Sequence, residues 1–318
     1  MKFYTMYFYG IGINSWMQQG VTAVAFINCQ TLKKKSKTPF ALRVIPVIFP
    51  WLERLAQPLA NRLFRFLFFT PIGYPTPEKE TKSETFAKTF ILSVGTMRIQ
   101  CYQWGKGGKT ILAVHGWAGR ATQFRRFVKP LLAGGYQVVA FDGPAHGKSS
   151  GRSTNLNEFL DVIQELKKQF DIEAIVAHSF GGVASLYAIA EGLPVKTLIT
   201  IASPTIADEI VNTYLHAIGG SAKTGNAFKD YILKRYGKPF EEYSSLQFIK
   251  RVPVSLNLLL VYDEDDQEVR MKHPEALLKL FPQARLFKTA GLGHTRILRD
   301  NSVIREVVTF IRFHSSEP

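Results

Sequence analysis

The chain has 318 residues, of which 46% are hydrophobic and 20% charged, so it can bury a full core and is not intrinsically disordered. Its two cysteines, Cys29 and Cys101, are too few for a disulfide-rich scaffold and lack metal-ligand spacing, which favours a reducing, cytoplasmic location. The net charge of +15 indicates attraction to anionic surfaces, but no aromatic and basic recognition motif accompanies it, so we expect no nucleic-acid partner.

The first segment, residues 1–29, is apolar and rich in aromatic residues, but polar residues such as Asn14 and Gln18 interrupt it. A secretory signal needs an early positive cluster and an unbroken apolar run, and a spanning helix needs roughly 20 predominantly apolar residues. We therefore predict a poorly ordered leader, with a signal or membrane anchor as the alternative.

Positive charge is concentrated near the N-terminus. Residues 1–88 hold twelve Lys or Arg against four Glu. Such a segment could contact the anionic inner face of a membrane, whereas the alternative is a soluble protein whose lysines are simply solvated. Peripheral membrane contact through this basic segment is therefore an open hypothesis.

Residues 40–69 carry apolar side chains at helical spacing. We expect three prolines to break this stretch into short helices, namely Pro46, Pro50 and Pro58. Residues 71–83 are polar and rich in proline, which predicts a connector. We expect the apolar face of residues 40–69 to pack on the domain that follows rather than on a membrane. Residues 1–85 are thus predicted to form a leader and a helical extension.

From residue 86 to residue 318, short apolar runs alternate with amphipathic segments. The runs predict strands at Phe90–Val94, Met97–Trp104, Thr110–Val114, Tyr136–Phe141, Ile172–Ala177, Val195–Ile201, Ser255–Val261 and Ala284–Thr289. Helical patterns separate most of them, as at Leu156–Phe170 and Val183–Glu191, and a last helix is expected from about Ile297 to Phe313. Nearly continuous apolar strands alternating with helices predict an α/β fold whose mostly parallel central sheet is covered by helices on both faces.

One interval departs from this alternation. About fifty residues of mainly helical character, from Thr205 to Arg251, separate two predicted strands. This is longer than an ordinary crossover, so residues 205–251 are a candidate helical lid over the sheet.

The central chemical feature is the run Ala177-His178-Ser179-Phe180-Gly181, which follows an apolar strand and precedes a helical pattern. A nucleophile elbow needs small residues two positions before and after its serine, and Ala177 and Gly181 fill these positions. The pattern A-x-S-x-G is weak by itself, but its strand-to-helix context favours Ser179 as a nucleophile.

A serine nucleophile needs a base, and the base needs a carboxylate to orient it. In such a fold the chain order is serine, acid, histidine. Of the histidines after the acidic loop at residues 263–266, His273 follows the loop directly and His314 lies in the final tail. His294, after Gly291-Leu292-Gly293, is therefore the predicted base.

The acid is less sharply defined, because four carboxylates share one loop. Adjacent side chains cannot all point inward. We favour Asp266 as the third member of the site and keep Asp263 as the alternative.

Acyl transfer also needs donors for the developing oxyanion. The backbone N–H of Phe180 is one candidate, because it begins a helix where N–H groups are free. The second is the N–H of Trp117, which Gly116 could present through a sharp turn. In these same loops His115, Gly116 and His178 are candidates for the substrate pocket.

Five motifs together resemble the α/β-hydrolase superfamily, over roughly residue 90 to the C-terminus. They are His-Gly-Trp at 115–117, Phe-Asp-Gly-Pro-Ala-His-Gly-Lys-Ser at 141–149, Ala-His-Ser-Phe-Gly-Gly at 177–182, the acidic run at 263–269 and Gly-Leu-Gly-His at 291–294. The combination looks like bacterial members described as hydrolases or esterases. The resemblance implies a triad of Ser179, Asp266 and His294, an oxyanion hole from Trp117 and Phe180, and a helical cap at about 205–251. It also implies that Asp142 and His146 form a structural turn.

These features predict a serine hydrolase that cleaves a small carboxylic ester or thioester without a metal or organic cofactor. Acyl transfer to an alcohol and amide cleavage use the same groups and stay open, as does a non-catalytic binding module of the same fold. The sequence does not indicate the acyl chain length or the oligomeric state.

Overall fold

The computed structural model describes residues 40–315, so our expectations for the apolar leader at residues 1–29 lie outside the described residues. Within the described part, eight strands form one sheet in the order β1-β2-β4-β3-β5-β6-β7-β8. The strands are β1 (Lys88–Val94), β2 (Met97–Trp104), β3 (Thr110–Val114), β4 (Gln137–Phe141), β5 (Ile172–His178), β6 (Thr197–Ile201), β7 (Asn257–Asp263) and β8 (Arg285–Thr289). Only the pairs β1–β2 and β2–β4 are antiparallel, so the predicted mostly parallel sheet is confirmed.

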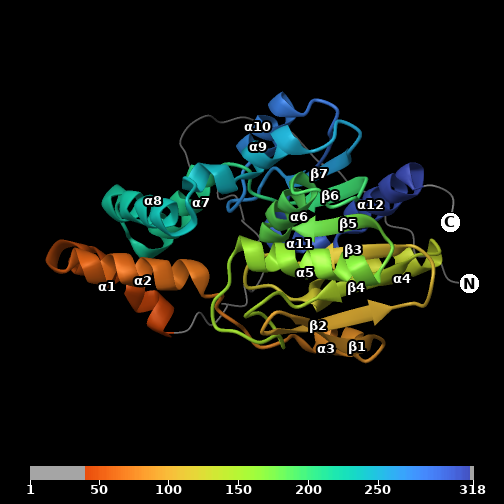
Figure 1. The fold of residues 1–318 in the computed structure, drawn as a ribbon, viewed down its shortest axis with the longest axis horizontal. Helices are drawn as coiled ribbons and strands as arrows, with labels where there is room; N and C mark the ends of the chain where they lie inside the picture. The colour runs from red at the N-terminus through yellow and green to blue at the C-terminus, as the bar shows by residue number, and fades with distance from the viewer. Residues whose placement is uncertain (1–39, 316–318) are drawn as a thin grey trace, which may run out of the picture. The chain divides into compact units, whose positions relative to one another are not determined.

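Helices cover both faces of this sheet, as Figure 1 shows. The longer ones are α1 (Phe40–Leu55), α2 (Gln57–Phe69), α3 (Glu78–Glu84), α4 (Arg125–Ala133), α5 (Leu156–Gln169), α6 (Phe180–Ala190), α7 (Ala207–Ile218), α8 (Ala222–Tyr236), α10 (Lys272–Leu280) and α12 (Asn301–His314). Two single turns, α9 (Ser245–Phe248) and α11 (Gly293–Arg296), complete the α-helices of residues 40–315. Apolar residues of α5, α6 and α10 cover one face of the sheet, and those of α4 and α12 cover the other.

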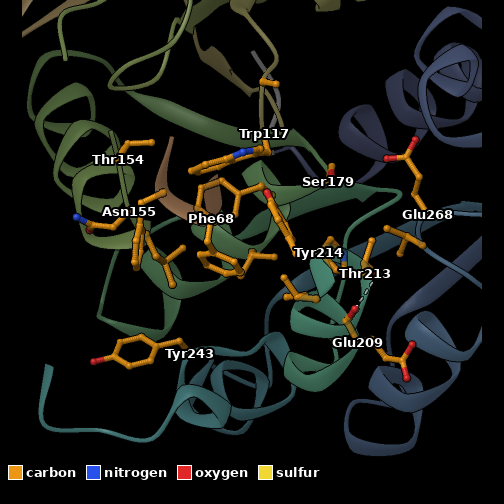
Figure 2. Close-up of a pocket in the computed structure, with 18 of the residues that line it drawn as sticks. Phe68, Trp117, Thr154, Asn155, Ser179, Glu209, Thr213, Tyr214, Tyr243 and Glu268 are labelled. Atoms are coloured by element: carbon orange, nitrogen blue, oxygen red, sulfur yellow. Dashed lines mark hydrogen bonds between the residues drawn. The ribbon is translucent and has the colours of Figure 1, made fainter. Parts of the chain in front are cut away.

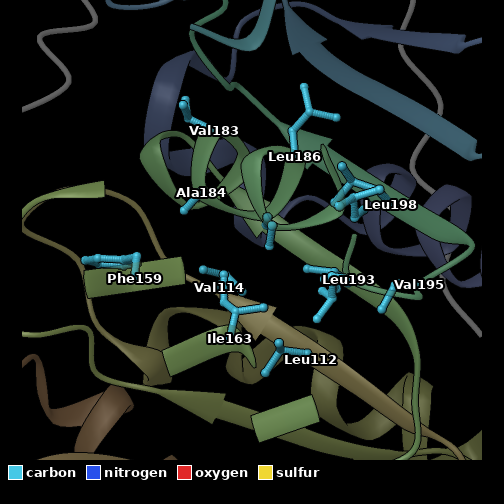
Figure 3. Close-up of a cluster of buried hydrophobic side chains, with 14 of the residues drawn as sticks. Leu112, Val114, Phe159, Ile163, Val183, Ala184, Leu186, Leu193, Val195 and Leu198 are labelled. Atoms are coloured by element: carbon cyan, nitrogen blue, oxygen red, sulfur yellow. The ribbon is translucent and has the colours of Figure 1, made fainter. Parts of the chain in front are cut away.

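The central strands are apolar along their whole length because both of their faces are buried. Every residue of β3, β4 and β6 is buried. Figure 3 shows side chains of α5 and α6 packed against Leu112 and Val114 of β3. The carboxyl ends of these strands are thereby held in fixed positions on one edge of the sheet, where β5 leads into Ser179.

The prediction that three prolines break residues 40–69 into short helices is wrong for two of them. Helix α1 runs through Pro46 and Pro50, and the chain breaks only at Ala56. Pro58 lies in the first turn of α2, where its missing N–H costs no helical hydrogen bond. Burial of Phe49 of α1 against the inserted helices offsets the hydrogen bonds that the two interior prolines remove.

The predicted connector at residues 71–83 also needs correction, because its second half begins α3. Pro77 precedes the helix, and Glu78 and Glu80 lie in its first turn, where carboxylates are favoured by the helix dipole. Glu80 is buried between Arg120 and Arg125, at 3.8 and 3.3 Å. Local composition does not indicate these two partners, because they lie 40 or more residues later in the sequence.

A third apolar cluster joins α1 and α2 to the inserted helices α7 and α8, which Figure 1 shows next to each other. Its fully buried residues include Phe49 and Phe64 from the first pair and Val211 and Phe228 from the second. Residues 40–69 thus pack on the domain that follows, as expected. Among the described helices, none is both long and apolar enough to cross a membrane.

Candidate active site

Ser179 occupies a strained turn between β5 and α6. Its φ of 50° is in the left-handed region, which a residue with a side chain rarely adopts and which costs of order 1–3 kcal/mol. A Cβ on Gly181 would lie 2.3 Å from the carbonyl oxygen of Val114, so only glycine fits there. The strand, the turn and the close approach together hold the Ser179 hydroxyl at the carboxyl edge of the sheet.

His294 lies between Ser179 and Asp266. Its Nε2 is 3.1 Å from the Ser179 Oγ, and its Nδ1 is 2.8 Å from Oδ2 of Asp266. The structure therefore brings together the three residues that the sequence suggested, in the geometry of a nucleophile, a base and an orienting acid.

Asp266 is buried and fully engaged. Its second oxygen, Oδ1, accepts hydrogen bonds from the backbone N–H groups of Glu268 and Val269, at 2.8 and 3.0 Å. Burial alone would raise the pKa of Asp266, but the hydrogen bond from His294 and these backbone donors hold the pKa below its ordinary value. The carboxylate is consequently charged at neutral pH.

Burial alone would lower the pKa of His294, but the hydrogen bond to Asp266 and the nearby charge of Glu268 hold it above the ordinary value. Glu268 lies 3.8 Å from Nε2 and is exposed. This carboxylate was not foreseen from the sequence, although it follows Asp266 by only two positions. It faces the same nitrogen as the Ser179 hydroxyl.

Asp263, the alternative acid, does not contact His294. Its two oxygens accept hydrogen bonds from the N–H groups of Leu292 and Gly293 and from the hydroxyl of Thr289. Burial alone would raise the pKa of Asp263, but these donors bring it below its ordinary value. Asp263 thus fixes the loop that carries His294, whereas Asp266 orients the ring.

The loop after β3 lies directly against Ser179. A Cβ on Gly116 would be 2.8 Å from Cβ of Ser179, and the rings of Trp117 and Phe180 are in edge contact at 5.3 Å. The next residue is also fixed, because the N–H of Ala118 donates to Nε2 of His146 at 3.0 Å. Trp117 and Phe180, the two proposed oxyanion donors, therefore flank the nucleophile.

His115 holds this loop in place through two contacts of its buried ring. It is buried, it contacts the carbonyl oxygen of Gly116 at 2.7 Å through Nδ1, and it accepts from the N–H of Gly143 at 2.7 Å through Nε2. Burial lowers the pKa of His115 to about 4, so the ring is neutral. Neither His115 nor Gly116 lines the cavity described below, so their place is behind its wall.

His178 differs in this respect, because it lines the cavity. Its Nε2 lies 2.9 Å from the carbonyl oxygen of His294, and the two rings are 4.8 Å apart. Burial lowers the pKa of His178 to about 3, so the neutral ring donates its Nε2–H to that carbonyl. This bond ties the end of β5 to the loop of the candidate base.

A cavity of about 460 Å³ opens beside Ser179, within the usual range for small-molecule sites. Figure 2 shows Phe68, Trp117 and Tyr214 around it, with Ser179 on its wall. Most of its lining is apolar or aromatic. Helix α2, the insertion and the first turns of α5 and α6 contribute Phe68, Phe69, Leu156, Val183, Ile210, Tyr214, Ala217, Ile232, Tyr236, Phe240 and Tyr243.

The contribution of α2 was not foreseen. Phe68 has its ring 4.8 Å from that of Tyr214 and 4.4 Å from that of Phe228. The only sequence signal was the apolar end of residues 40–69, which does not reveal where that end packs.

Two acidic residues, Glu209 and Glu268, also line the cavity, and Glu209 is paired with Lys272. Among the described residues, no three His, Cys, Asp or Glu side chains gather into a metal site.

Known proteins resemble this chain over part of its length. The profile of the alpha/beta hydrolase family matches residues 111–306. A 2-hydroxy-6-oxononadienedioate/2-hydroxy-6-oxononatrienedioate hydrolase from Cupriavidus pinatubonensis is 34% identical over 119 residues, which are 34% of this chain and 40% of that protein. A dihydrolipoyllysine-residue acetyltransferase component of the acetoin cleaving system from Cupriavidus necator is 32% identical over 148 residues, 44% of this chain and 39% of that protein.

The chain thus spans about two fifths of the length of these curated relatives. Among solved structures, an esterase from Pyrococcus furiosus is similar with a TM-score of 0.59 and 21% identity, covering 77% of this chain and 98% of that chain. At that identity the likeness concerns the fold alone. It confirms the predicted α/β-hydrolase fold.

Proposed function

Since the chain belongs to the alpha/beta hydrolase family, we propose that it is a serine hydrolase that cleaves a carboxylic ester or thioester through an acyl-enzyme on Ser179. One observation carries the proposal, namely the continuous hydrogen-bonded chain from Ser179 through His294 to the buried Asp266. It joins the strand-to-helix turn of Ser179 to the loop of His294, 115 positions later in the sequence.

In the proposed first step, the Ser179 oxygen attacks the substrate carbonyl carbon while Nε2 of His294 accepts its proton. Asp266 stabilises the imidazolium that forms, since its carboxylate faces Nδ1. His294 then gives the proton to the leaving alcohol or thiol, and the acyl group stays on Ser179. A water molecule, deprotonated by His294, releases the acid and restores the serine. The chemistry uses only protein groups and water.

We assign the oxyanion to the backbone N–H groups of Trp117 and Phe180. Phe180 is the first residue of α6, where an N–H has no helical acceptor. Trp117 follows Gly116, whose backbone lies close to Ser179. This brings the N–H of Trp117 toward the substrate carbonyl that Ser179 attacks. Loss of one such donor typically costs about 10²–10³-fold in kcat.

The acyl group is assigned to the aromatic cavity, and residues 205–251 to a lid over it. The wall built by Phe68, Tyr214 and Phe240 favours an apolar acyl chain, because burial of apolar surface contributes about 25 cal/mol per Å².

Acyl transfer is the second candidate function. It is favoured by the 32% identical relative named as an acetyltransferase component, since the same acyl-enzyme can react with an alcohol or thiol instead of water.

A fluorophosphonate probe tests the nucleophile. We expect it to label the wild type and not Ser179→Ala. The Ser185→Ala variant, which changes a buried serine of α6 six residues later, should keep its label. A series of p-nitrophenyl esters then measures the preferred chain length, and added alcohol separates transfer from hydrolysis. If the folded wild type neither labels nor cleaves any ester, the proposal fails and a binding module of the same fold takes its place.

A further inference from the structure

Helices α1 and α2 have two opposite faces, and only one is covered by the described residues. The inner face, with Phe49, Ala60 and Phe64, is fully buried in the cluster shared with α7 and α8. The outer face, as we call it, consists of six exposed apolar side chains: Val47, Ile48, Trp51, Leu55, Leu59 and Phe66. Their exposed fractions run from 53% to 81%, which is high for residues of this size.

The spacing of these residues makes each set a single helical face. Val47, Trp51 and Leu55 are four residues apart on α1, and Leu59 and Phe66 are seven apart on α2. Because such an apolar stripe lies opposite the buried one, folding of the described chain leaves it in water. Both helices are too short to span a bilayer, so a membrane would be met at its surface.

The charges of the helix pair indicate what kind of partner the outer face binds. Arg54 and Arg62 are exposed beside the outer face, and residues 40–69 contain one acidic residue, Glu53. That carboxylate is occupied, since it accepts from the N–H and the hydroxyl of Ser221 at 3.0 Å. Immediately ahead of α1 the sequence adds four lysines: Lys33, Lys34, Lys35 and Lys37.

We propose that the outer face of α1 and α2 docks on an anionic lipid bilayer, with its apolar side chains in the interface and its arginines at the headgroups. Positive charge beside an apolar stripe is the pattern that binds anionic membranes. A symmetric contact between two copies would place two positively charged faces against each other, and like charges disfavour that arrangement. Helix α2 also provides Phe68 and Phe69 to the cavity wall, so the docking surface and the cavity share one helix.

Co-sedimentation of the full chain with vesicles tests this. We expect binding to vesicles of equal parts phosphatidylglycerol and phosphatidylcholine, and much weaker binding to phosphatidylcholine alone. The double variant Trp51→Gln/Leu59→Gln should bind anionic vesicles at least about tenfold less, because it removes two large apolar side chains from the interface. A second variant, Arg54→Gln/Arg62→Gln, should lower the preference for anionic over neutral vesicles by at least about fivefold.

The matched control is Val254→Gln/Phe313→Gln, which changes two apolar residues outside the helix pair that are more exposed than Trp51 and Leu59, and it should bind as the wild type does. Ser179→Ala should also bind normally, so a failure of the proposed hydrolase activity leaves this test intact. Circular dichroism and fluorophosphonate labelling verify that each surface variant is folded.

Three results would overturn the proposal. The wild type fails to bind anionic vesicles, or the Trp51→Gln/Leu59→Gln variant binds as well as the wild type, which would assign binding to the lysines alone. The third is a wild-type dimer in analytical ultracentrifugation that this variant converts to a monomer, since the outer face would then be a protein interface.

Discussion

Replacing Asp266 by asparagine tests the role proposed for the acid of the site. The substitution keeps the volume of the side chain but removes the charge that faces Nδ1 of His294 at 2.8 Å. For charges about 4 Å apart at an effective dielectric constant of about 20, that charge stabilises the imidazolium by about 4 kcal/mol, or about 10³-fold in rate. An amide N–H pointing at the ring also favours the tautomer that cannot accept the serine proton. We therefore expect kcat to fall about 10³–10⁴-fold at neutral pH.

Asp263→Asn is the matched control, since it removes the same charge from the same loop without touching the ring. It should lower the melting temperature, because the N–H groups of Leu292 and Gly293 donate to different oxygens and the amide keeps only one of these. One of the two N–H groups therefore loses its acceptor, at about 1–3 kcal/mol for a buried unsatisfied group. Its kcat should stay within about tenfold of the wild type. Steady-state ester hydrolysis and thermal unfolding of both variants give the comparison. Equal losses of kcat in two folded variants would refute the assignment of Asp266.

Three further predictions follow from the site. The pKa of His294 is raised, and its protonated form cannot accept the serine proton, so kcat/KM should fall on acidification with a midpoint above pH 6.5. Glu268→Gln should move that midpoint to lower pH, because it removes a negative charge near Nε2. A midpoint that does not move would show that Glu268 does not raise the pKa of His294. Gly181→Ala should lower the free energy of unfolding, measured in urea, by about 1–3 kcal/mol and abolish probe labelling, because its Cβ would lie 2.3 Å from a carbonyl oxygen. Phe68→Ala should shift the preferred ester to a longer chain, whereas Phe66→Ala, on the exposed side of α2, should leave the chain-length profile unchanged.

The sequence predicted those parts of the site that depend on local pattern. Ser179 stands between an apolar strand and a helix, and His294 follows the last strand, so their position at one edge of the sheet follows from strand direction alone. The choice between Asp263 and Asp266 needed coordinates. Asp263 ends β7 and accepts hydrogen bonds from backbone N–H groups of the His294 loop, whereas the carboxylate of Asp266 faces the His294 ring.

Features that depend on distant contacts were predicted less well. Pro46 and Pro50 indicate broken helices, but the burial of Phe49 between α1 and the insertion keeps α1 continuous. Glu80 looks like a solvated residue in a connector, yet it is buried with two arginines from beyond residue 115. The sequence pattern places Phe68 at the end of an amphipathic helix but does not indicate that its side chain lines the cavity. In each case the deciding partner is more than 30 residues away in the chain.

The origin of the cavity wall has a consequence for directed evolution of this chain. The residues assigned to bond cleavage lie in loops at the carboxyl edge of the sheet, whereas much of the apolar cavity wall comes from two other segments, α2 and the insertion. Libraries that vary the wall can therefore retune substrate preference while leaving the reaction machinery untouched. Phe68 contacts Tyr214, Phe228 and Phe240, so substitutions at these positions will not be additive. Such a library should vary the two segments together rather than one after the other.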